Sequence, residues 1–216
     1  MVQLNPTQPS ANPVINEPTT QVVTSQVQLI DFKKIVLLGP SASGKTTWFC
    51  KVRTGQFGNG DYVASYGMTA RCTRVTSPVS GVTTIFDVWD IAGDDHLMCQ
   101  VEEHFVGARG FVFFLDLQVN DENHVSGGTE IPLFLSFLKN HAATLDGSLP
   151  RVVFVANKLD LVPQENAEQI EEWLNNFSNN ISENGSEFGI TDFSILTLSV
   201  KNDTVEDLLA PLLQFV

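Results

Sequence analysis

A glycine-rich segment directly after a short apolar run constrains this chain more than any other feature. The run Ile35–Leu38 has the composition of a strand that is buried on both faces of a sheet. The next residues, Gly39–Thr46, read G-P-S-A-S-G-K-T and match the pattern G-x-x-x-x-G-K-[S/T]. A helix-compatible segment, Thr46–Val52, follows at once. A strand, a glycine-rich turn and a helix in this order predict a loop that binds phosphate groups.

The chemistry of this loop follows from its backbone and two side chains. Backbone N–H groups and a helix N-terminus wrap the phosphates, Lys45 reaches the β- and γ-phosphates, and the Thr46 hydroxyl ligates magnesium. The alternative is a glycine-rich turn that binds nothing, and the flanking strand and helix argue against it. The residues that we predict to contact the phosphates are Gly39, Ser41, Ala42, Ser43, Gly44, Lys45, Thr46 and Thr47.

Further apolar runs predict the sheet to which this loop belongs. Phe111–Leu117, Val152–Ala156 and Phe193–Val200 resemble the first run in length and composition. Continuous apolar runs, as opposed to alternating ones, are typical of parallel strands that helices cover on both faces. We therefore expect an α/β fold in three layers, with helices on each side of a mostly parallel sheet.

Helices and loops are predicted between and after these runs. Apolar side chains recur at helical spacing over Ile170–Phe177, and again over Val205–Leu212 after a capping box at Asp203–Glu206. Two polar stretches rich in Asn, Gly, Ser and acidic residues, Asn120–Thr129 and Ser178–Asp192, are expected to be loops.

The N-terminal segment differs in composition from the rest of the chain. Residues 1–28 hold four prolines, one charged residue and no aromatic side chain, so they cannot bury enough surface to offset the entropy of ordering. We expect a disordered tail over residues 1–28 and a single domain over residues 29–216. No run of about 18 apolar residues or secretory signal pattern is found, which predicts a cytoplasmic protein.

The net charge is −13, and its excess is confined to one part of the chain. Residues 1–100 carry seven charges of each sign, whereas residues 101–216 carry five basic and 18 acidic side chains. This balance argues against direct binding of nucleic acid or anionic lipid. Glu165, Glu168, Glu171 and Glu172 are expected to form a solvated helix face, with a site for a basic protein surface as the alternative.

Two short motifs at the ends of later runs indicate which nucleotide the loop would hold. Asn157-Lys158-Leu159-Asp160 closes the run that begins at Val152, and Ser199-Val200-Lys201 closes the last run. They resemble the guanine-reading N-K-x-D and S-A-K motifs of the Ras superfamily, with Val200 in place of alanine. A carboxylate at Asp160 can accept hydrogen bonds from the N1–H and the exocyclic amine of guanine. The residues that this resemblance implies for binding the base are Asn157, Lys158, Asp160, Ser199, Val200 and Lys201.

The resemblance extends over about residues 33–216 and is strongest to the Ran and Rab branches. Trp89–Gly93 is similar to the motif W-D-T-A-G, which implies that Asp90 holds Mg²⁺ through a water and that the Gly93 N–H approaches the γ-phosphate. Thr54–Phe57 and Tyr62–Gly67 are similar to the first switch region. The resemblance therefore implies a Ras-like P-loop NTPase fold with a six-stranded, mostly parallel sheet, bound GTP or GDP, and Mg²⁺.

Two positions in the first switch region are candidates for contact with nucleotide or metal. Phe57 would pack against the guanine, although a core aromatic is an equal alternative from sequence alone. Ser65 takes the position of the switch threonine, where its hydroxyl can bind Mg²⁺ and sense the γ-phosphate. Thr69 is a competing candidate for that role.

The chain departs from the family pattern where the attacking water is oriented. The family usually has glutamine after W-D-x-A-G, and here the residue is Asp94, followed by Asp95. A carboxylate about 5 Å from a γ-phosphate charge meets a repulsion of about 3 kcal/mol at an effective dielectric constant near 20. We therefore expect GTP hydrolysis to be slow, with Lys45, Ser65, Gly93 and Asp94 as the catalytic group. The alternative is that the two acidic residues only begin a switch helix.

Partners and rival functions follow from the same resemblance. It implies a monomeric molecular switch with effector, exchange-factor and GTPase-activating partners, and Leu97 and Met98 are candidates for effector contact. Neither terminus has a lipidation motif, so we expect no lipid-anchored membrane attachment, and a nuclear location is the alternative if the protein is Ran-like. A pseudo-GTPase that acts as a nucleotide-bound interaction module and a P-loop kinase for a small metabolite are the rival functions.

Overall fold

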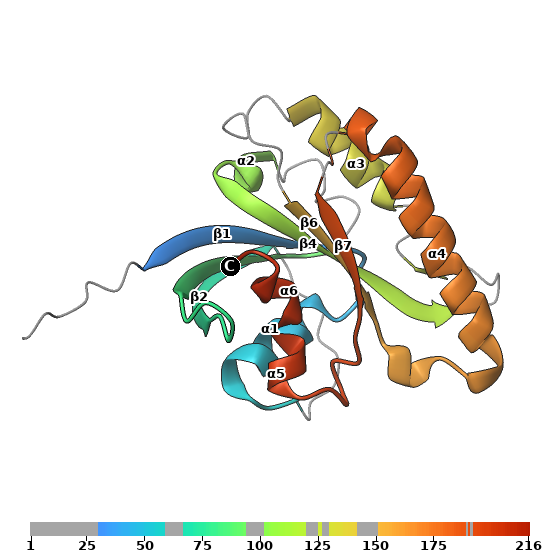
Figure 1. Ribbon diagram of the computed structural model, residues 1–216, viewed down its shortest axis with the longest axis horizontal. Helices are drawn as coiled ribbons and strands as arrows, with labels where there is room; N and C mark the ends of the chain where they lie inside the picture. The colour runs from blue at the N-terminus through green and yellow to red at the C-terminus, as the bar shows by residue number, and fades with distance from the viewer. Residues whose placement is uncertain are drawn as a thin grey trace, which may run out of the picture.

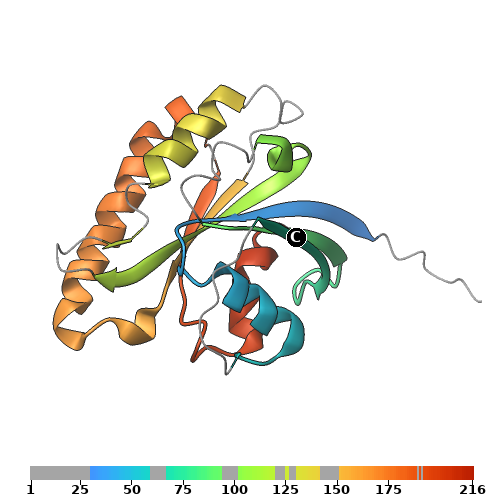
Figure 2. The ribbon, with the colours of Figure 1, turned by 180° about the vertical axis from the view of Figure 1, so that it is seen from behind.

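A twisted β-sheet with helices on both faces forms the body of the protein in the computed structural model (Figures 1 and 2). The structure describes residues 30–58, 67–93, 102–119, 125–126, 130–141, 151–188, 190 and 192–216. The strands are β1 (Asp31–Leu38), β2 (Met68–Thr76), β3 (Thr83–Ile91), β4 (Ala108–Val119), β5 (Val125–Ser126), β6 (Arg151–Asn157) and β7 (Phe193–Thr197).

The strand order in the main path of the sheet is β2-β3-β1-β4-β6-β7. β1 pairs with β3 and β4 in parallel, and β4–β6 and β6–β7 are also parallel. The edge strand β2 pairs antiparallel with β3. The predicted six-stranded, mostly parallel sheet of an α/β fold is therefore confirmed, with a two-residue addition, β5, that pairs antiparallel with β4.

Helices cover the two faces of the sheet in two separate groups (Figures 1 and 2). The helices α1 (Lys45–Thr54), α5 (Val205–Leu208) and α6 (Ala210–Leu213) lie on one face, where they contribute to one apolar cluster. The helices α3 (Glu130–His141) and α4 (Ala167–Asn184) pack on the other face, in the second cluster. The short helix α2 (Glu102–Phe105) precedes β4. Short 3₁₀ segments span Leu159–Leu161, Gln164–Asn166 and Gly185–Phe188.

The first strand shows why its sequence is apolar at successive positions. Val36 and Leu38 enter the cluster under α3 and α4, whereas Ile35 and Leu37 enter the cluster under α1 and α5. All four side chains are at most 1% exposed. A strand buried on both faces cannot carry polar residues at alternate positions, so β1 ends as a rigid element directly before the glycine-rich segment.

Three local predictions are corrected by the structure. The segment Ser178–Asp192, predicted to be a loop, is helical through Asn184 and 3₁₀ over Gly185–Phe188. Helix α4 continues because Ile181, four residues after Phe177, is 2% exposed and extends the apolar stripe into the core. The predicted loop Asn120–Thr129 contains β5.

The third correction concerns the capping box before α5. It is formed by Thr204 and Asp207, one residue later than predicted, with the Asp207 N–H donating to Thr204 Oγ1 and the Thr204 N–H to Asp207 Oδ2. The carboxylate of Asp203 instead accepts a hydrogen bond from the Ser199 N–H at 2.7 Å. This places Asp203 in the turn after β7.

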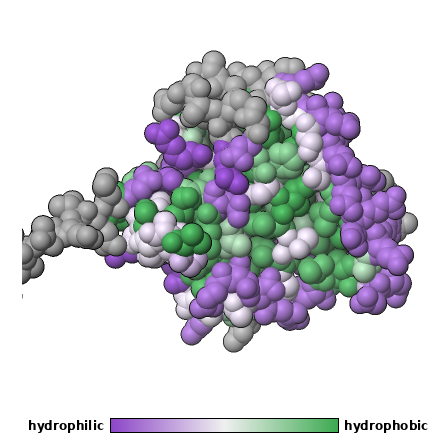
Figure 3. Space-filling model, viewed as in Figure 1, coloured by the Kyte–Doolittle hydropathy of each residue, from purple (hydrophilic) through white to green (hydrophobic). Residues whose placement is uncertain are grey.

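The outer face of α4 is hydrophilic, as Figure 3 shows along the edge of the molecule that this helix forms. Glu168, Glu171 and Glu172 on α4 are exposed, as is Glu165 just before it. The prediction of a solvated acidic helix face is therefore confirmed. None of the described helices has the length and apolar character needed to cross a membrane.

Candidate nucleotide-binding site

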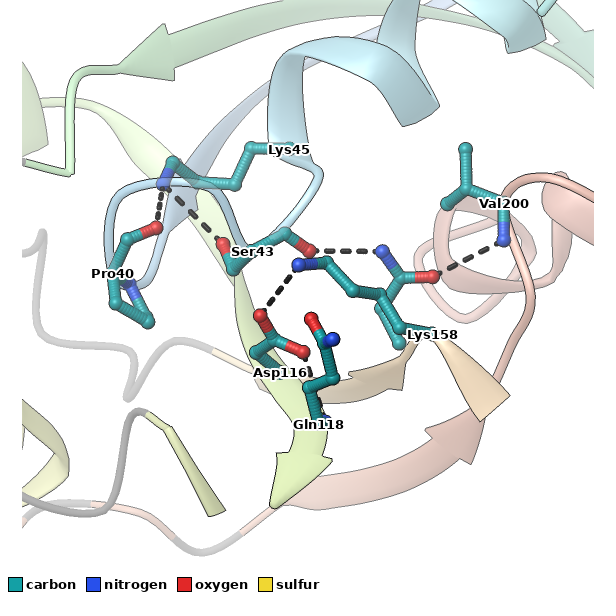
Figure 4. Close-up of polar contacts among 8 residues, drawn as sticks. Pro40, Ser43, Lys45, Asp116, Gln118, Lys158 and Val200 are labelled. Carbon is teal, nitrogen blue, oxygen red and sulfur yellow. Dashed lines mark hydrogen bonds and ion pairs between the residues drawn. The ribbon is translucent and has the colours of Figure 1, made fainter. Parts of the chain in front are cut away.

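The predicted site residues gather where parallel strands end. The glycine-rich loop follows β1, Asn157 ends β6, and Ser199 and Val200 follow β7, so their segments meet at the carboxyl edge of the sheet. Ligands in open α/β sheets bind in the crevice outside this edge. Figure 4 shows the side chains from these separate segments beside one another.

The backbone of the glycine-rich loop packs closely against strand β4 at Gly39. Gly39 has φ +125°, and a Cβ atom at this position would lie 2.2 Å from the carbonyl oxygen of Phe114. Ala42 has φ 63°, and it and Lys158 are the non-glycine residues with positive φ among the described residues. Both were predicted as site residues from sequence. Backbone in this sparsely populated region is typical of ligand-binding loops.

Lys45 folds back over the loop from the first turn of α1. Its Nζ donates to Gly39 O at 2.6 Å. The same Nζ donates to Pro40 O at 2.7 Å and lies 3.5 Å from Ser43 Oγ (Figure 4). The side chain is 5% exposed. The loop carbonyls therefore hold a positive charge directly over the segment predicted to wrap the phosphates.

Thr46 and Asp90 form the predicted magnesium pair. Thr46 Oγ1 donates to Asp90 Oδ2 at 2.6 Å, and Asp90 is 4% exposed at the end of β3. Burial raises the pKa of the Asp90 carboxyl, against the opposing effects of the hydrogen bond from Thr46 and the charge of Lys45. Asp90 Oδ1 is buried and accepts no hydrogen bond from the described residues. A buried carboxylate oxygen beside a hydroxyl is a donor set that fits a hard divalent cation such as Mg²⁺.

Gly93 brings the segment after β3 against the glycine-rich loop. A Cβ atom at Gly93 would lie 2.4 Å from Pro40 C and 2.5 Å from both Gly39 O and Ser41 N. Only a residue without a side chain fits this contact. The structure thus places Gly93 beside the predicted phosphate loop.

Asn157 links the glycine-rich loop to the turn after β7. Its Nδ2 donates to Ser43 O at 2.8 Å, and its Oδ1 accepts from the Val200 N–H at 3.1 Å (Figure 4). The side chain is 2% exposed. One amide therefore fixes the distance between the two segments that were predicted to hold phosphate and base.

Lys158 and Asp160 each have a hydrogen-bond partner in the structure, and neither pairing was predicted from the sequence. Lys158 Nζ donates to Asp116 Oδ2 at 2.6 Å, and Asp116 Oδ1 accepts from the Gln118 N–H at 3.0 Å (Figure 4). Asp160 Oδ1 accepts from Ser199 Oγ at 2.6 Å. Asp116 was missed, although a carboxylate at the end of the apolar run of β4 is an unusual feature that could have marked it.

Phe57 is half-exposed beside α1. It is 40% exposed and belongs to neither apolar cluster, so the alternative of a core aromatic is wrong. Its ring centroid lies 5.9 Å from Lys51 Nζ.

Two further predicted site residues lie in described segments. Thr47 lies in the first turn of α1, and Lys201 is exposed in the turn after β7.

Several predicted residues lie outside the described part of the chain. These are residues 62–66 of the predicted first switch region, which include the switch candidate Ser65, the catalytic candidate Asp94 with its neighbour Asp95, and the effector candidates Leu97 and Met98. Thr69, the competing candidate for the switch hydroxyl, is exposed on the edge strand β2 and lies opposite Asp90 in the register.

The fold, the glycine-rich loop and the motifs after β6 and β7 together define a Ras-like P-loop protein. The chain belongs to the Ras superfamily of small GTPases and is related to its Ran and Rab branches. More specifically, residues 34–160 match the family described as Ras of Complex, Roc, domain of DAPkinase. This match covers more than half of the chain.

Several known proteins are similar to parts of this chain. The chain is 29% identical over 133 residues to the GTP-binding nuclear protein GSP1 of Encephalitozoon cuniculi, and the aligned region covers 59% of this chain and 55% of that protein. It is 29% identical over 84 residues to the human Ras-related protein Rab-37, which covers 39% of this chain and 37% of that protein. A third relative, the human EF-hand calcium-binding domain-containing protein 4B, is 28% identical over 162 residues, 74% of this chain and 20% of that protein. The chain therefore spans about half the length of GSP1 and less of the others.

Proposed function

We propose that this chain binds GTP and GDP together with Mg²⁺ and acts as a nucleotide-dependent molecular switch. The observation that carries the proposal is the side chain of Asn157, which bonds to Ser43 O of the glycine-rich loop and to the Val200 N–H of the turn after β7. A guanine nucleotide needs a phosphate site and a base site at a fixed separation, and these two hydrogen bonds would hold the two proposed sites at such a separation.

The phosphate half of the proposed site consists of the glycine-rich loop and the start of α1. The residues of Ser41–Thr47 offer backbone N–H groups, and Lys45 supplies a positive charge that its carbonyl partners already hold in place. Thr46 and Asp90 would hold Mg²⁺, Asp90 through a water, with Ser65 as a further ligand. When bound, Mg²⁺ would offset the charge of the β- and γ-phosphates.

The base half consists of Phe57 and the motifs after β6 and β7. Asp160 would accept two hydrogen bonds from the guanine edge, and Ser199 already donates to its Oδ1. Lys158 and the turn at Ser199–Lys201 would line the base, and Phe57 would pack against it. Adenine does not present the two donors that this carboxylate requires, so the proposed specificity is for guanine.

Switching is proposed to depend on the γ-phosphate. Contacts from Ser65 and from the Gly93 N–H would order the segments that contain them, and loss of the γ-phosphate would release these contacts. Gly93 already lies against the glycine-rich loop. Effectors, exchange factors and GTPase-activating proteins are the partners that such a cycle requires.

Hydrolysis is proposed to be slow in the absence of a partner protein. Asp94 stands where a neutral residue would orient water, and its negative charge opposes the approach to a γ-phosphate. Lys45, Ser65, Gly93 and Asp94 form the proposed catalytic group. The same feature supports a second candidate function, a pseudo-GTPase that stays nucleotide-bound and serves as an interaction module.

A single-turnover measurement separates these two functions. We expect the full chain loaded with GTP to hydrolyse it slowly, and Asp94→Gln to raise the rate by about tenfold or more, since removal of a repulsion of about 3 kcal/mol exceeds one tenfold step. Asp95→Asn, a neighbouring neutralisation, serves as the control. An unchanged rate in Asp94→Gln would refute the repulsion, and no turnover in any variant would favour the pseudo-GTPase.

The nucleotide that remains bound after mild purification tests the proposed ligand. We expect the purified protein to retain GTP or GDP in nearly equal molar amount. In competition binding, we expect GTP to displace a fluorescent guanine nucleotide far better than ATP does. Retention of adenine nucleotide, or competition won by ATP, would instead support the P-loop kinase.

The extent and location of the proposed GTPase domain are also proposals. We assign it to residues 29–216, with residues 1–28 as a tail outside it, and we propose that it is a monomeric cytoplasmic protein, or a nuclear one by analogy with Ran. Limited proteolysis in the presence of GDP should leave a fragment that begins near residue 29.

A further inference from the structure

Lys51, in the last turn of α1, is a buried cation outside the predicted site. It is 8% exposed, and its Nζ donates to three backbone carbonyl oxygens: Val200 O at 2.9 Å, Lys201 O at 3.0 Å and Asp203 O at 2.8 Å. An ammonium group has three donors, and each finds one acceptor here. Among the described residues, no carboxylate forms an ion pair with Lys51. Its charge is therefore balanced by the dipoles of one turn.

These three bonds set the orientation of the turn after β7. A trans peptide is planar, so a carbonyl that points at Lys51 makes the N–H of the next residue point away from α1. This holds for the amides of Lys201 and Asn202. Val200 is fixed on both sides, because its carbonyl accepts from Lys51 and its N–H donates to Asn157 Oδ1.

The same turn carries the hydrogen-bond partner of Asp160. The Asn202 N–H donates to Ser199 Oγ at 3.1 Å, and Ser199 Oγ donates to Asp160 Oδ1 at 2.6 Å. The carboxylate of Asp203 accepts from the Ser199 N–H. A change in the orientation of this turn would therefore displace the hydroxyl that orients Asp160.

Lys51 also faces the aromatic residue of the base half. Its Nζ lies 5.9 Å from the ring centroid of Phe57, within the range of a cation–π contact. Trp48, one turn earlier on α1, donates from Nε1 to Leu208 O at 2.8 Å, so α1 is anchored to the C-terminal segment at two points. One helix thus begins at the phosphate loop with Lys45 and, in its last turn, places Lys51 beside the base half.

We propose that Lys51 is a positioning residue that determines base specificity by holding the turn Ser199–Asp203 and Phe57 in place from α1. It acts through Ser199 and Asp160, and it does not itself touch the nucleotide. This inference rests on the proposed guanine-nucleotide binding and adds to it the residue that sets the geometry of the base half.

The test compares three single variants of the full chain with the wild type. Lys51→Met keeps the length of the side chain and removes its donors, and Lys51→Arg restores a cation with several donors. Lys33→Met is the matched control, since Lys33 Nζ also donates to a backbone carbonyl, that of Phe215, in a part of the fold remote from the glycine-rich loop. The measurements are the dissociation rate of a fluorescent GDP analogue, the ratio of dissociation constants for GDP and ADP, and Tm.

We expect Lys51→Met to release the GDP analogue about 10-fold to 100-fold faster, as loss of a charged hydrogen-bond set implies, and to reduce the preference for GDP over ADP by a similar factor. Lys51→Arg should recover most of both properties. Lys33→Met should lower Tm while both nucleotide properties stay within about threefold of the wild type.

A lower Tm in Lys51→Met with an unchanged dissociation rate and GDP-to-ADP ratio would overturn the inference. If this variant does not fold, Lys51→Gln, which keeps two neutral donors, is judged by the same criterion. A wild-type protein that does not prefer GDP to ADP would instead refute the proposed function, so the two failures are distinguishable.

Discussion

The two halves of the candidate site are built in different ways. The phosphate half depends on backbone: its loop closes against Phe114 O at Gly39 and against Gly93, and its buried carboxylate, Asp90, keeps one oxygen without a hydrogen bond among the described residues. The base half depends on side chains that pair with one another. Lys158 binds Asp116, and Ser199 binds Asp160.

The phosphate half therefore contains a buried carboxylate oxygen that no described residue satisfies, whereas the polar groups of the base half are paired and held in position. The phosphate half buries an uncompensated acceptor that only a cation or a proton can satisfy at low cost. The base half holds its hydrogen-bonding groups in fixed directions, which is what discrimination between purines requires. The side chain of Asn157 bonds to both halves, through Ser43 and Val200.

The largest effect is expected from a change in the base half alone. Asp160→Asn replaces an acceptor pair by one acceptor and one donor, which complements a purine with N1–H and a carbonyl at C2, namely xanthine. We expect the ratio of GDP to xanthosine diphosphate affinity to fall by about 10⁴-fold. Competition binding measures this ratio.

The control is Asp192→Asn, which neutralises an exposed carboxylate whose Oδ2 lies 3.5 Å from Arg151 Nη1. This variant should leave the ratio unchanged. If Asp160→Asn weakens both nucleotides equally, Asp160 does not read the base and the side-chain character of this half is refuted.

A smaller effect is expected from removal of the link between the halves. Asn157→Ala leaves Ser43 O and the Val200 N–H buried without their partner, which costs about 2–4 kcal/mol in the free energy of unfolding and about 10-fold to 100-fold in GDP affinity. Denaturant titration and fluorescent-nucleotide binding measure the two quantities.

Asn176→Ala, at an exposed position of α4, is the matched control, with an expected change within about 0.5 kcal/mol. Wild-type GDP affinity in Asn157→Ala would show that each half holds its position without the link.

The smallest effect is expected for the charge of the phosphate half. Because burial raises the pKa of Asp90, its ionised form destabilises the nucleotide-free fold above that pKa, and stability increases as pH falls through it. Asp90→Asn should therefore raise the Tm of the nucleotide-free protein at neutral pH by about 3 °C, with a smaller gain at acidic pH. It should also abolish the dependence of GDP affinity on Mg²⁺.

Asp31→Asn provides a control of opposite sign, since Lys33 lowers the pKa of the exposed Asp31. This variant should not raise Tm. An Asp90→Asn protein that loses stability at neutral pH would mean that the carboxylate is compensated in the nucleotide-free state.

The sequence predicted the interior of the fold better than its edge. β1, β4 and β6 were found because strands covered on both faces leave continuous apolar runs. The edge strand β2 was not predicted, because Thr69, Ala70, Arg71 and Cys72 are exposed and show no such run. The end of α4 was missed because the propensities of Ser and Asn were outweighed by the burial of Ile181.

Motifs predicted which residues would gather, and the structure added the residues that hold them. Asn157 and Asp160 are recognisable because their spacing is local. Asp116 and Lys51 are 42 and 149 positions from their partners Lys158 and Val200, and no local pattern records such a contact. Supporting residues of this kind become visible only when the fold brings distant segments together.

The close contact at Gly93 has a mechanical consequence. Backbone atoms of Pro40 and Ser41 occupy the space that even a methyl group at Gly93 would need. The end of β3 therefore has no room to slide toward the loop, and a displacement of the loop backbone at Pro40 or Ser41 toward β3 would press directly on the backbone of Gly93.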